Sequence, residues 1–357
     1  MSATEENVSY SQWTLPEANG IDSLKLVQSA PIGPLGDNEV AVELHAASLN
    51  YRELVIAKNA FPPPWSSTMR PNLIPGSDGS GVVKAVGSNV SSFNPGDRVV
   101  THMTPHLGPN SYPTFGDICA GLGHGADGTL RQYGHFEQAA LVRAPESLSF
   151  EEAATLTCSG LTAWNALFGL EGRKVNSGDW ALVQGTGGVS VAALQFAVTA
   201  GANVVATTSS EAKAARLKAL GAKHVVNYKT TPEWGPAARE LTPQGRGFDV
   251  VVDIGGDTTL GESLKAVRTE GLVVAAGMIG GSAESPVPMM AALTTVCIVR
   301  GILLGTKAQF EEMVQFIDKN DVRPVVDDKV FGLDEAKEAM RMLERQEHFS
   351  KIVIKLR

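Results

Sequence analysis

The pattern of apolar and polar residues divides the chain into two parts. In the first part, short segments such as 39–44 alternate apolar and polar side chains, which is typical of strands with one buried face. Turn sequences such as Asn-Pro-Gly-Asp at 94–97 separate them, because proline presets one turn torsion and glycine accepts a positive φ. This part predicts a small, barrel-like antiparallel domain. Its long Gly/Pro/His-rich segment at 101–129 is expected to border a site.

The second part of the chain alternates strands and helices. The apolar segment 180–183 is typical of a strand buried on both faces of a parallel sheet, and a glycine turn and a helix over about 190–200 follow it. A strand over 203–207, a helix over 211–220 and a strand over 224–227 continue the alternation. The predicted fold class is therefore α/β, a doubly wound parallel sheet accompanied by the barrel-like domain.

Composition and charge narrow the class of protein. The 357 residues include 30 Lys and Arg against 38 Asp and Glu, a net charge of −8 without a dense basic run, so nucleic acid is not expected as a partner. Cys119, Cys158 and Cys297 lie far apart, which argues against a disulfide framework and predicts a reducing compartment. The polar start of the chain and the lack of roughly 20 uninterrupted apolar residues predict neither secretion nor a membrane helix. We expect a cytoplasmic enzyme.

The glycine turn at 185–190 (Gly-Thr-Gly-Gly-Val-Ser) follows the first buried strand and precedes a helix. Dinucleotide binding requires glycines in this position, because the chain turns tightly and its backbone must approach a pyrophosphate at a helix N-terminus. Gly185 and Gly187 meet these two requirements. Ser190 replaces the third glycine of the pattern, and it is small enough to leave the prediction of a dinucleotide site standing.

The choice of cofactor is predicted from the end of the second strand. In NAD-binding proteins an acidic side chain at this strand end bonds the ribose 2′-hydroxyl, whereas this chain has hydroxyls up to Ser209 and Ser210 followed by Lys213. Hydroxyls and an ammonium suit a 2′-phosphate, while Glu211 is expected to interact with the helix dipole. This segment favours NADPH, the alternative being that Lys213 is an ordinary solvated lysine.

Longer motifs make the sequence similar to a known family. These motifs are Asn-Pro-Gly-Asp-Arg-Val at 94–99, Cys-Ser-Gly-Leu-Thr-Ala-Trp at 158–164 and Val-Gln-Gly-Thr-Gly-Gly-Val-Ser at 183–190. From about residue 40 onward the chain resembles the medium-chain dehydrogenase/reductase superfamily, in its zinc-free, quinone-oxidoreductase-like branch. The resemblance implies a GroES-like catalytic domain (1–150, with a returning C-terminal segment at 301–357), a Rossmann NADPH-binding domain (151–300) and hydride transfer.

The resemblance also implies which residues bind NADPH. The turn 186–189 would hold the pyrophosphate, and Ser209, Ser210, Lys213 and Tyr228 would surround the 2′-phosphate. Residues at the ends of later strands would line the nicotinamide. The complete set of expected cofactor-binding residues is Thr162, Gly185, Thr186, Gly187, Gly188, Val189, Ser209, Ser210, Lys213, Tyr228, Gly255, Gly277, Ile302, Leu303 and Lys351.

The sequence departs from the zinc branch of the resembling family at its metal ligands. Segments 48–53 and 75–79 lack the cysteine and the histidine that this branch supplies there, and Cys158 alone does not make a site that needs three protein ligands. No metal site is therefore expected. A rival set in the long segment, around His102, His106 and His124, would need a helix that its prolines disfavour.

Without a metal to polarise a carbonyl, a conjugated substrate is the favoured hydride acceptor. In an enone or quinone the charge spreads onto oxygen, where hydrogen-bond donors suffice to stabilise it. Asn50 and Tyr51 are the candidate catalytic residues, as oxygen-binding donor and proton donor. Alternatively, Asn50 bonds a turn backbone and Tyr51 is an ordinary buried aromatic. Tyr112 and Tyr133 are rival proton donors.

Three functions stay open: an NADPH-dependent reductase of activated alkenes or quinones, a zinc-independent alcohol dehydrogenase or carbonyl reductase, and a non-catalytic NADPH-binding protein. Phe61, Trp65 and Met103 favour a small, hydrophobic substrate, although aromatic residues near prolines also simply pack. The apolar segment 296–304 either extends a sheet across a homodimer interface, as the resemblance suggests, or completes the parallel sheet.

Overall fold

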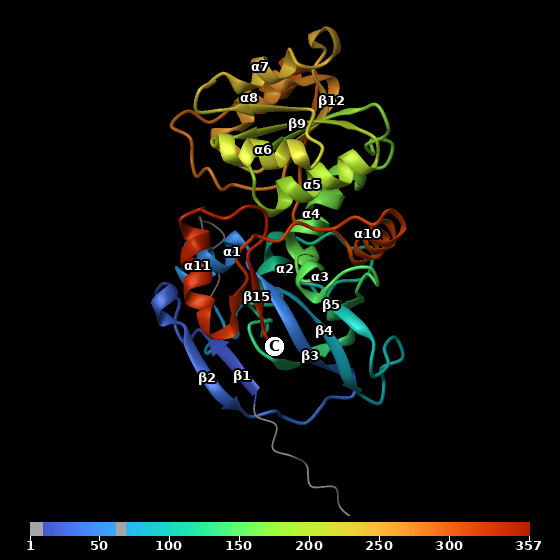
Figure 1. The fold of residues 1–357 in the computed structure, drawn as a ribbon, viewed down its shortest axis with the longest axis vertical. Helices are drawn as coiled ribbons and strands as arrows, with labels where there is room; N and C mark the ends of the chain where they lie inside the picture. The colour runs from blue at the N-terminus through green and yellow to red at the C-terminus, as the bar shows by residue number, and fades with distance from the viewer. Residues whose placement is uncertain (1–9, 62–68) are drawn as a thin grey trace, which may run out of the picture. The chain divides into compact units, whose positions relative to one another are not determined.

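The computed structural model describes residues 10–61 and 69–357, so Trp65 lies outside the described residues. The chain forms two compact units: the first comprises Met1–Cys158 and Val326–Arg357, and the second comprises Ser159–Val325. The C-terminal segment thus returns to the first unit at Val326, and each unit contains its own sheet (Figure 1).

The first unit is built on a mostly antiparallel sheet in the order β14-β15-β3-β4-β5-β7, and β6 also pairs with β3. β3 is central because β4, β6 and β15 all pair with it. A separate hairpin of β1 and β2 completes the strands. Their bounds are β1 Tyr10–Thr14, β2 Lys25–Ala30, β3 Glu39–Ser48, β4 Asp78–Val86, β5 Arg98–Thr101, β6 Tyr133–Glu137, β7 Leu141–Arg143, β14 Phe331–Gly332 and β15 Val353–Lys355.

The second unit contains a six-stranded parallel sheet in the order β10-β9-β8-β11-β12-β13. β8 is buried along its whole length, which explains its uninterrupted apolar sequence. The predicted α/β class is confirmed. The strand bounds are β8 Trp180–Gln184, β9 Asn203–Thr208, β10 His224–Asn227, β11 Phe248–Asp253, β12 Val267–Ala275 and β13 Ile298–Gly301.

Helices pack on both sheets. In the second unit α5 contacts β8 and β9, α6 contacts β9 and β10, and α8 contacts β11 and β12. The bounds are α1 Tyr51–Ala57, α2 Phe115–Ala120, α3 Phe150–Ala153, α4 Leu161–Phe168, α5 Gly188–Thr199, α6 Glu211–Ala219, α7 Trp234–Arg239, α8 Leu260–Ala266, α9 Ala291–Thr295, α10 Lys307–Asn320 and α11 Ala336–Glu344. None of the helices in the described ranges has the length and apolar character that a membrane crossing requires.

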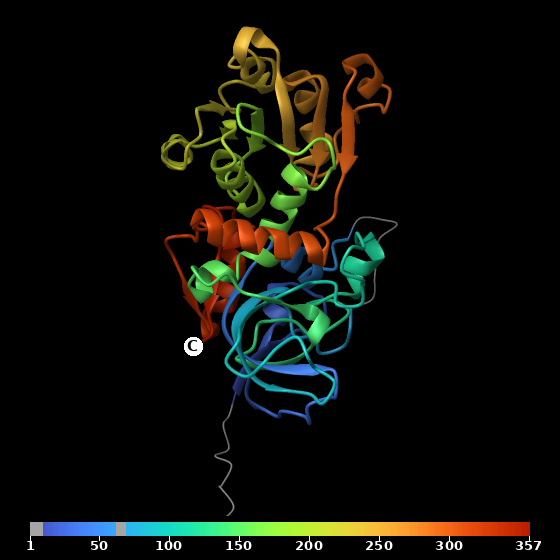
Figure 2. The ribbon, with the colours of Figure 1, turned by 90° about the vertical axis from the view of Figure 1, so that its right-hand side faces the viewer.

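One apolar segment forms a shorter strand than its sequence pattern. The apolar segment 296–304 contains only β13 (Ile298–Gly301), because Val296 and Leu304 adopt positive φ values of 54° and 58° on either side of the strand. β13 forms one edge of the parallel sheet, drawn in orange in Figure 2.

The helical region that begins at Phe150 is interrupted. A π-helical turn, Leu156–Gly160, separates α3 from α4. In this turn the Cys158 backbone N–H donates to Asp78 Oδ2 at 3.3 Å, and the Thr157 hydroxyl donates to the Thr101 carbonyl at 2.7 Å. These contacts with β4 and β5 hold a backbone that local helix propensity does not specify.

Candidate functional site

The turn between β8 and α5 has the geometry that a pyrophosphate requires. Gly185 has a φ of 76°, and its N–H donates to the Thr207 carbonyl of β9 at 2.9 Å. Gly187 is the N-cap of α5 and has no side chain to bond the first N–H groups of the helix. A Cβ added to either glycine would have no atom within 4 Å, so there is space beside the turn. Thr186, Gly188 and Val189 complete this turn, which can hold an anion at a helix N-terminus.

Ser190 explains the departure from three glycines. Its side chain is fully buried, and its hydroxyl donates to the Gln184 carbonyl at the end of β8, at 2.5 Å. The third glycine of the pattern permits close packing of helix on strand. Here the serine is small enough to allow that packing and adds a hydrogen bond between the two elements.

The predicted 2′-phosphate residues lie at the adjoining ends of β9 and β10. Thr208 is paired with Asn227 in the sheet, and the N–H of Tyr228 donates to the Thr208 carbonyl at 3.1 Å. Ser210 is the N-cap of α6, where its hydroxyl accepts from the Lys213 N–H at 3.4 Å. Ser209, Ser210, Lys213 and Tyr228 are thus brought to one edge of the sheet.

Glu211 is the one acidic side chain in the first turn of α6. Its carboxylate accepts from the Asn227 side-chain amide at 2.9 Å, which ties the start of α6 to the end of β10. The helix dipole stabilises a carboxylate in this position. This negative charge is an exposed neighbour of the predicted phosphate residues.

The loops after β11 and β12 contain Gly255 and Gly277, and a buried carboxylate organises the loop after β11. Asp253 Oδ1 accepts from the N–H groups of Gly255 (3.1 Å) and Gly256 (2.9 Å), and its Oδ2 accepts from Gln184 Nε2 at 3.1 Å. A Cβ on Gly277 would lie 2.7 Å from the Ile254 carbonyl oxygen, so this position requires glycine. Sequence reasoning missed Asp253 and Gln184, although an aspartate ending an apolar strand was the available signal.

The remaining predicted cofactor residues of the second unit lie after β13 and in α4. Ile302 is buried and its N–H donates to the Ala275 carbonyl at 3.0 Å, whereas Leu303 is exposed. Thr162 is buried in the first turn of α4. Asn165 of the same helix donates to the Leu304 carbonyl at 2.7 Å, so this contact holds the segment after β13 against α4.

A second cluster lies in the first unit and is centred on Lys351, which is 4% exposed. Its ammonium donates to the Leu49 carbonyl at 2.7 Å and to Asn50 Oδ1 at 2.5 Å, and it lies 3.4 Å from Asp78 Oδ2. These three acceptors match the three N–H groups of an ammonium. Lys351, predicted from the resemblance to bind cofactor, is therefore engaged with Asn50 inside the first unit.

The charges around Lys351 balance. Arg52 pairs with Glu53 at 3.5 Å, beside the pair of Lys351 and Asp78, so two cations face two anions. Glu53 is buried and its Oε2 accepts from the Asn50 N–H at 2.6 Å, which fixes Asn50 at the N-terminus of α1. Burial raises the pKa of Glu53, although Arg52 opposes this shift. Paired in this way, four charged groups can be taken out of water together.

The segments that supply metal ligands in the zinc branch do converge on this cluster. They contribute Asn50, Asp78 and Cys158, but Asp78 Oδ2 already receives the Ser48 hydroxyl at 3.2 Å, the Cys158 N–H and Lys351. Burial raises the pKa of the Cys158 thiol to about 12, with Asp78 adding to the shift. An amide at position 50 and a carboxylate oxygen that already receives three donors do not fit a catalytic zinc, which needs three ligand donors and an open position.

The rival histidines do not form a ligand set. His124 Nδ1 lies 2.7 Å from the Cys119 carbonyl oxygen, while His106 lies 3.0 Å from Asp117 at the N-terminus of α2. Hydrogen bonds from Thr114 and His106 lower the pKa of Asp117 to about 2. Over residues 10–61 and 69–357, no three His, Cys, Asp or Glu side chains are arranged to hold a metal ion.

The candidate tyrosines lie in different surroundings. Tyr51 is the first residue of α1, directly after Asn50, and is 42% exposed, so it is not a buried aromatic. Tyr133 lies on β6, opposite Glu43 of β3, where its ring stacks on Tyr10 with centroids 4.8 Å apart. Tyr133 is therefore not grouped with Asn50. Tyr112 is also exposed, in the long segment before α2.

Comparison with known proteins identifies the family. Residues 36–146 match the alcohol dehydrogenase GroES-like domain, and residues 188–319 match the zinc-binding dehydrogenase family. A zinc-type alcohol dehydrogenase-like protein of Schizosaccharomyces pombe is 40% identical over 95% of this chain and 97% of its own length. The chain belongs to the medium-chain dehydrogenase/reductase superfamily.

Solved structures agree with this membership. A putative alcohol dehydrogenase from Sinorhizobium meliloti 1021 superposes with a TM-score of 0.87 at 35% identity, covering 99% of this chain and 100% of that one. The 2-octenoyl-CoA carboxylase reductase CinF, in complex with NADP and 2-octenoyl-CoA, gives a TM-score of 0.83 at 26% identity, covering 97% and 87%. As a medium-chain dehydrogenase/reductase, the protein is an oxidoreductase that uses a nicotinamide cofactor and a small-molecule substrate.

Proposed function

We propose that this medium-chain dehydrogenase/reductase is an NADPH-dependent reductase that transfers hydride to a conjugated alkene or a quinone without a metal. The observation that carries the proposal is the Lys351 ammonium among Asn50, Leu49 and Asp78, where the zinc branch supplies its ligands. A metal ion held there would lie close to the buried Lys351 ammonium, and the repulsion between the two positive charges costs free energy at short range. Electrophilic assistance then has to come from hydrogen-bond donors, and a conjugated acceptor places the lowest demand on them.

The proposed chemistry uses Asn50 and Tyr51. NADPH, when bound, supplies the hydride to the β-carbon of the acceptor. The Asn50 amide donates from its N–H to the acceptor oxygen, where charge develops as the carbon–carbon double bond moves toward an enolate. Because Lys351 donates to Asn50 Oδ1, it polarises the amide and strengthens it as a donor. The enolate then takes a proton from the exposed Tyr51 hydroxyl, which solvent reprotonates.

The preference for NADPH rests on the edge formed by β9, β10 and α6. Ser209, Ser210 and Tyr228 offer hydroxyls there, and Lys213 offers an ammonium for charge-assisted hydrogen bonds to a 2′-phosphate. The carboxylate of Glu211 is bonded to Asn227 and is already partly neutralised by the helix dipole. CinF, a relative of the same fold, has been solved in complex with NADP.

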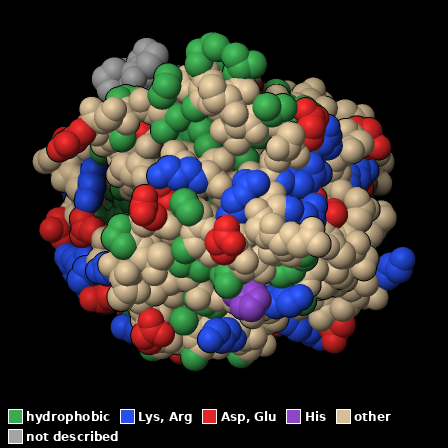
Figure 3. Space-filling view, turned by 90° about the horizontal axis from the view of Figure 1, so that it is seen from above, with side chains coloured by type: hydrophobic (Ala, Val, Ile, Leu, Met, Phe, Trp, Pro, Cys, Tyr) green, Lys and Arg blue, Asp and Glu red, His purple; other side chains and the backbone are tan. Residues whose placement is uncertain are grey.

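We further propose a cytoplasmic homodimer that takes a small hydrophobic substrate. Cys119, Cys158 and Cys297 are all free thiols, as a reducing compartment requires. Apolar side chains gather on the surface around the edge strand β13, along one rim of the face in Figure 3, and a second copy could cover them. They are Met278, Ile279, Met289, Met290, Leu293, Val296, Val299 and Leu303.

The decisive experiment follows NADPH absorbance with chelator-treated protein. The panel contains a quinone, an enone, an enal and a simple ketone, with NADH as the control for cofactor preference. Turnover of the quinone or the enone after chelation is the expected result. Turnover of the ketone alone would replace the proposal with carbonyl reduction, which the alcohol dehydrogenase names of two relatives favour. Activity lost to the chelator would overturn the metal-free mechanism.

A further inference from the structure

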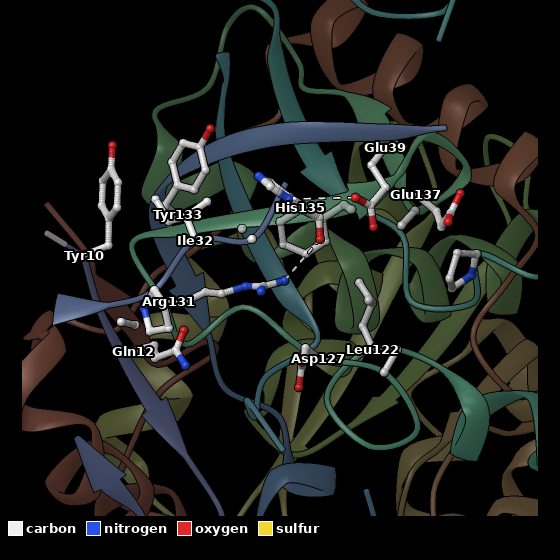
Figure 4. A pocket seen from close by; sticks show the side chains of 18 of the residues that line it. Tyr10, Gln12, Ile32, Glu39, Leu122, Asp127, Arg131, Tyr133, His135 and Glu137 are labelled. Atoms are coloured by element: carbon white, nitrogen blue, oxygen red, sulfur yellow. Dashed lines mark hydrogen bonds and ion pairs between the residues drawn. The ribbon is translucent and has the colours of Figure 1, made fainter. Parts of the chain in front are cut away.

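The first unit contains a cavity of about 350 Å³ beside β6 (Figure 4). Tyr10, Ile32, Arg131, Tyr133 and His135 are among its lining residues, and none of the proposed catalytic or cofactor residues is. Glu39, at the start of β3, also lines it, whereas the Lys351 cluster lies beyond the other end of this strand. The ten residues of β3 span about 30 Å when extended, so the cavity is distinct from that cluster.

Arg131 is the buried cation of this cavity. It is 9% exposed, and its guanidinium runs across the centre of the view in Figure 4. Nη2 donates to the His135 carbonyl at 3.4 Å, and the guanidinium carbon lies 4.7 Å from the centre of the Phe136 ring. Within the described part of the chain Nε has no hydrogen-bond acceptor. A buried guanidinium without an ion pair is costly unless an anion reaches it.

The backbone is shaped to admit this side chain. A Cβ added to Gly134 would lie 2.4 Å from both Cζ and Nε of Arg131. The guanidinium therefore packs directly against the Gly134 backbone, and any larger residue at position 134 would displace it. Gly134 and Phe136 together hold Arg131 flat against β6, where its side chain lines the cavity and its Nε is buried against Gly134.

Two of the three carboxylates that line the cavity, Asp127 and Glu39, are engaged elsewhere. Asp127 pairs with Arg70 at 2.7 Å and accepts from the Ile74 N–H at 3.1 Å. Glu39 accepts from the Gly36 N–H at 2.8 Å and lies 3.8 Å from His135. Burial lowers the pKa of Arg131 to about 10, although Asp127 raises it from a distance. Among residues 10–61 and 69–357, the cation therefore has through-space compensation but no direct ion pair.

We propose that this cavity binds a small organic monocarboxylate whose carboxylate pairs with the Arg131 guanidinium. A planar carboxylate matches the geometry of a guanidinium and supplies the direct ion pair that Arg131 lacks among the described residues. The stacked rings of Tyr10 and Tyr133, together with Ile32, provide an apolar surface for the body of the ligand. The carboxylates of Glu39 and Glu137 on the same wall disfavour a second negative charge.

The test measures binding of benzoate to the full chain by calorimetry and by thermal shift. Benzamide, an uncharged molecule of nearly the same shape, and phthalate, a dianion, are the comparison ligands. Arg131→Met removes the cation, and Gly134→Ala keeps the cation but displaces it. Arg143→Met is the matched control, because Arg143 also lies over a phenylalanine (Phe93) but does not line the cavity.

We expect benzoate to bind the native protein and the Arg143→Met variant equally. The affinity should fall by roughly 10- to 100-fold in Arg131→Met and in Gly134→Ala, the effect of losing one charge-assisted hydrogen bond. Benzamide and phthalate should bind more weakly than benzoate. Equal binding of benzoate and benzamide, unchanged affinity in both variants, or no binding to the native protein would each overturn the proposal. Far-UV circular dichroism of each variant verifies that it is folded, and Gly134→Ala provides the test if Arg131→Met is not.

Discussion

Lys351 and Arg131 are both cationic side chains buried in the first unit, with 4% and 9% exposure, but their surroundings differ. Lys351 donates to a carbonyl and an amide and also pairs with Asp78, within a group of two cations and two anions. Arg131 lies against Gly134 and Phe136 on a cavity wall and has no ion pair within the described ranges. The first arrangement holds a neighbouring amide in place, whereas the second leaves a cation without a carboxylate partner beside a cavity. Burial alone therefore does not distinguish a structural cation from a binding cation.

The largest expected difference between the two cations is in how much each contributes to the free energy of unfolding. Lys351→Met leaves Asp78 buried without its partner, so we expect a loss of about 3–5 kcal/mol in the free energy of unfolding. Arg131→Met should change it by about 1 kcal/mol or less, because it removes a desolvated charge that has no partner to strand. Urea denaturation measures both. A Lys351→Met/Asp78→Asn variant, which removes both charges, should recover part of the lost unfolding free energy. Equal losses in Lys351→Met and Arg131→Met would contradict the comparison.

Catalysis should depend on the amide that Lys351 holds. Asn50→Asp keeps an oxygen that can accept from Lys351 but removes the N–H donor. We expect kcat to fall by about 10²- to 10³-fold, as for the loss of one oxyanion donor, with little change in KM for NADPH. Steady-state kinetics on the enone or quinone measures this. Tyr51→Phe should instead change the pH profile of kcat, and an Asn50→Asp variant within threefold of native kcat would exclude the donor role.

Lys213 offers a third cation, which is near the surface and proposed to bind an anion. Lys213→Ala should raise KM for NADPH by roughly 10- to 100-fold, because one charge-assisted hydrogen bond to the 2′-phosphate is lost, and leave KM for NADH almost unchanged. The ratio of the two KM values is the measurement. Lys218→Ala, on the same helix, is the matched control. Equal changes for NADPH and NADH would show that Lys213 does not contact the phosphate.

The smallest expected effect is the contribution of Glu53 to the pH dependence of the unfolding free energy. Burial raises the pKa of Glu53, so the folded protein binds this proton more tightly than the unfolded chain. The resulting stabilisation is fully present below the unfolded pKa of about 4.3 and is lost as pH rises through the folded pKa. Glu53→Gln should therefore flatten the decline in unfolding free energy over this range. Glu344→Gln, in an exposed pair with Lys58, should not, and parallel curves for Glu53→Gln and the native protein would contradict the expectation.

Sequence reasoning predicted local elements well and long-range partners poorly. The strands His224–Asn227 and Phe248–Asp253 and the turn before α5 follow from apolar runs and glycines, which act over a few residues. The π-helical turn after α3 does not follow from such local patterns, because the contacts of Thr157 with β5 and of Cys158 with Asp78 override local helix propensity. Asn50 was predicted as a candidate, but its bond to Lys351 joins residues 301 positions apart.

The sequence by itself therefore determined the α/β class, the glycine turn and the hydroxyl-rich end of β9, because each is encoded within one strand, turn and helix. Only the tertiary structure decided that Lys351 bonds to Asn50 and Asp78, and that Arg131 lines a cavity with its guanidinium packed against Gly134. The physical reason is that the free energy of a buried charge depends on which groups surround it in space. For Lys351 these partners come from distant parts of the chain, where no sequence period reveals them.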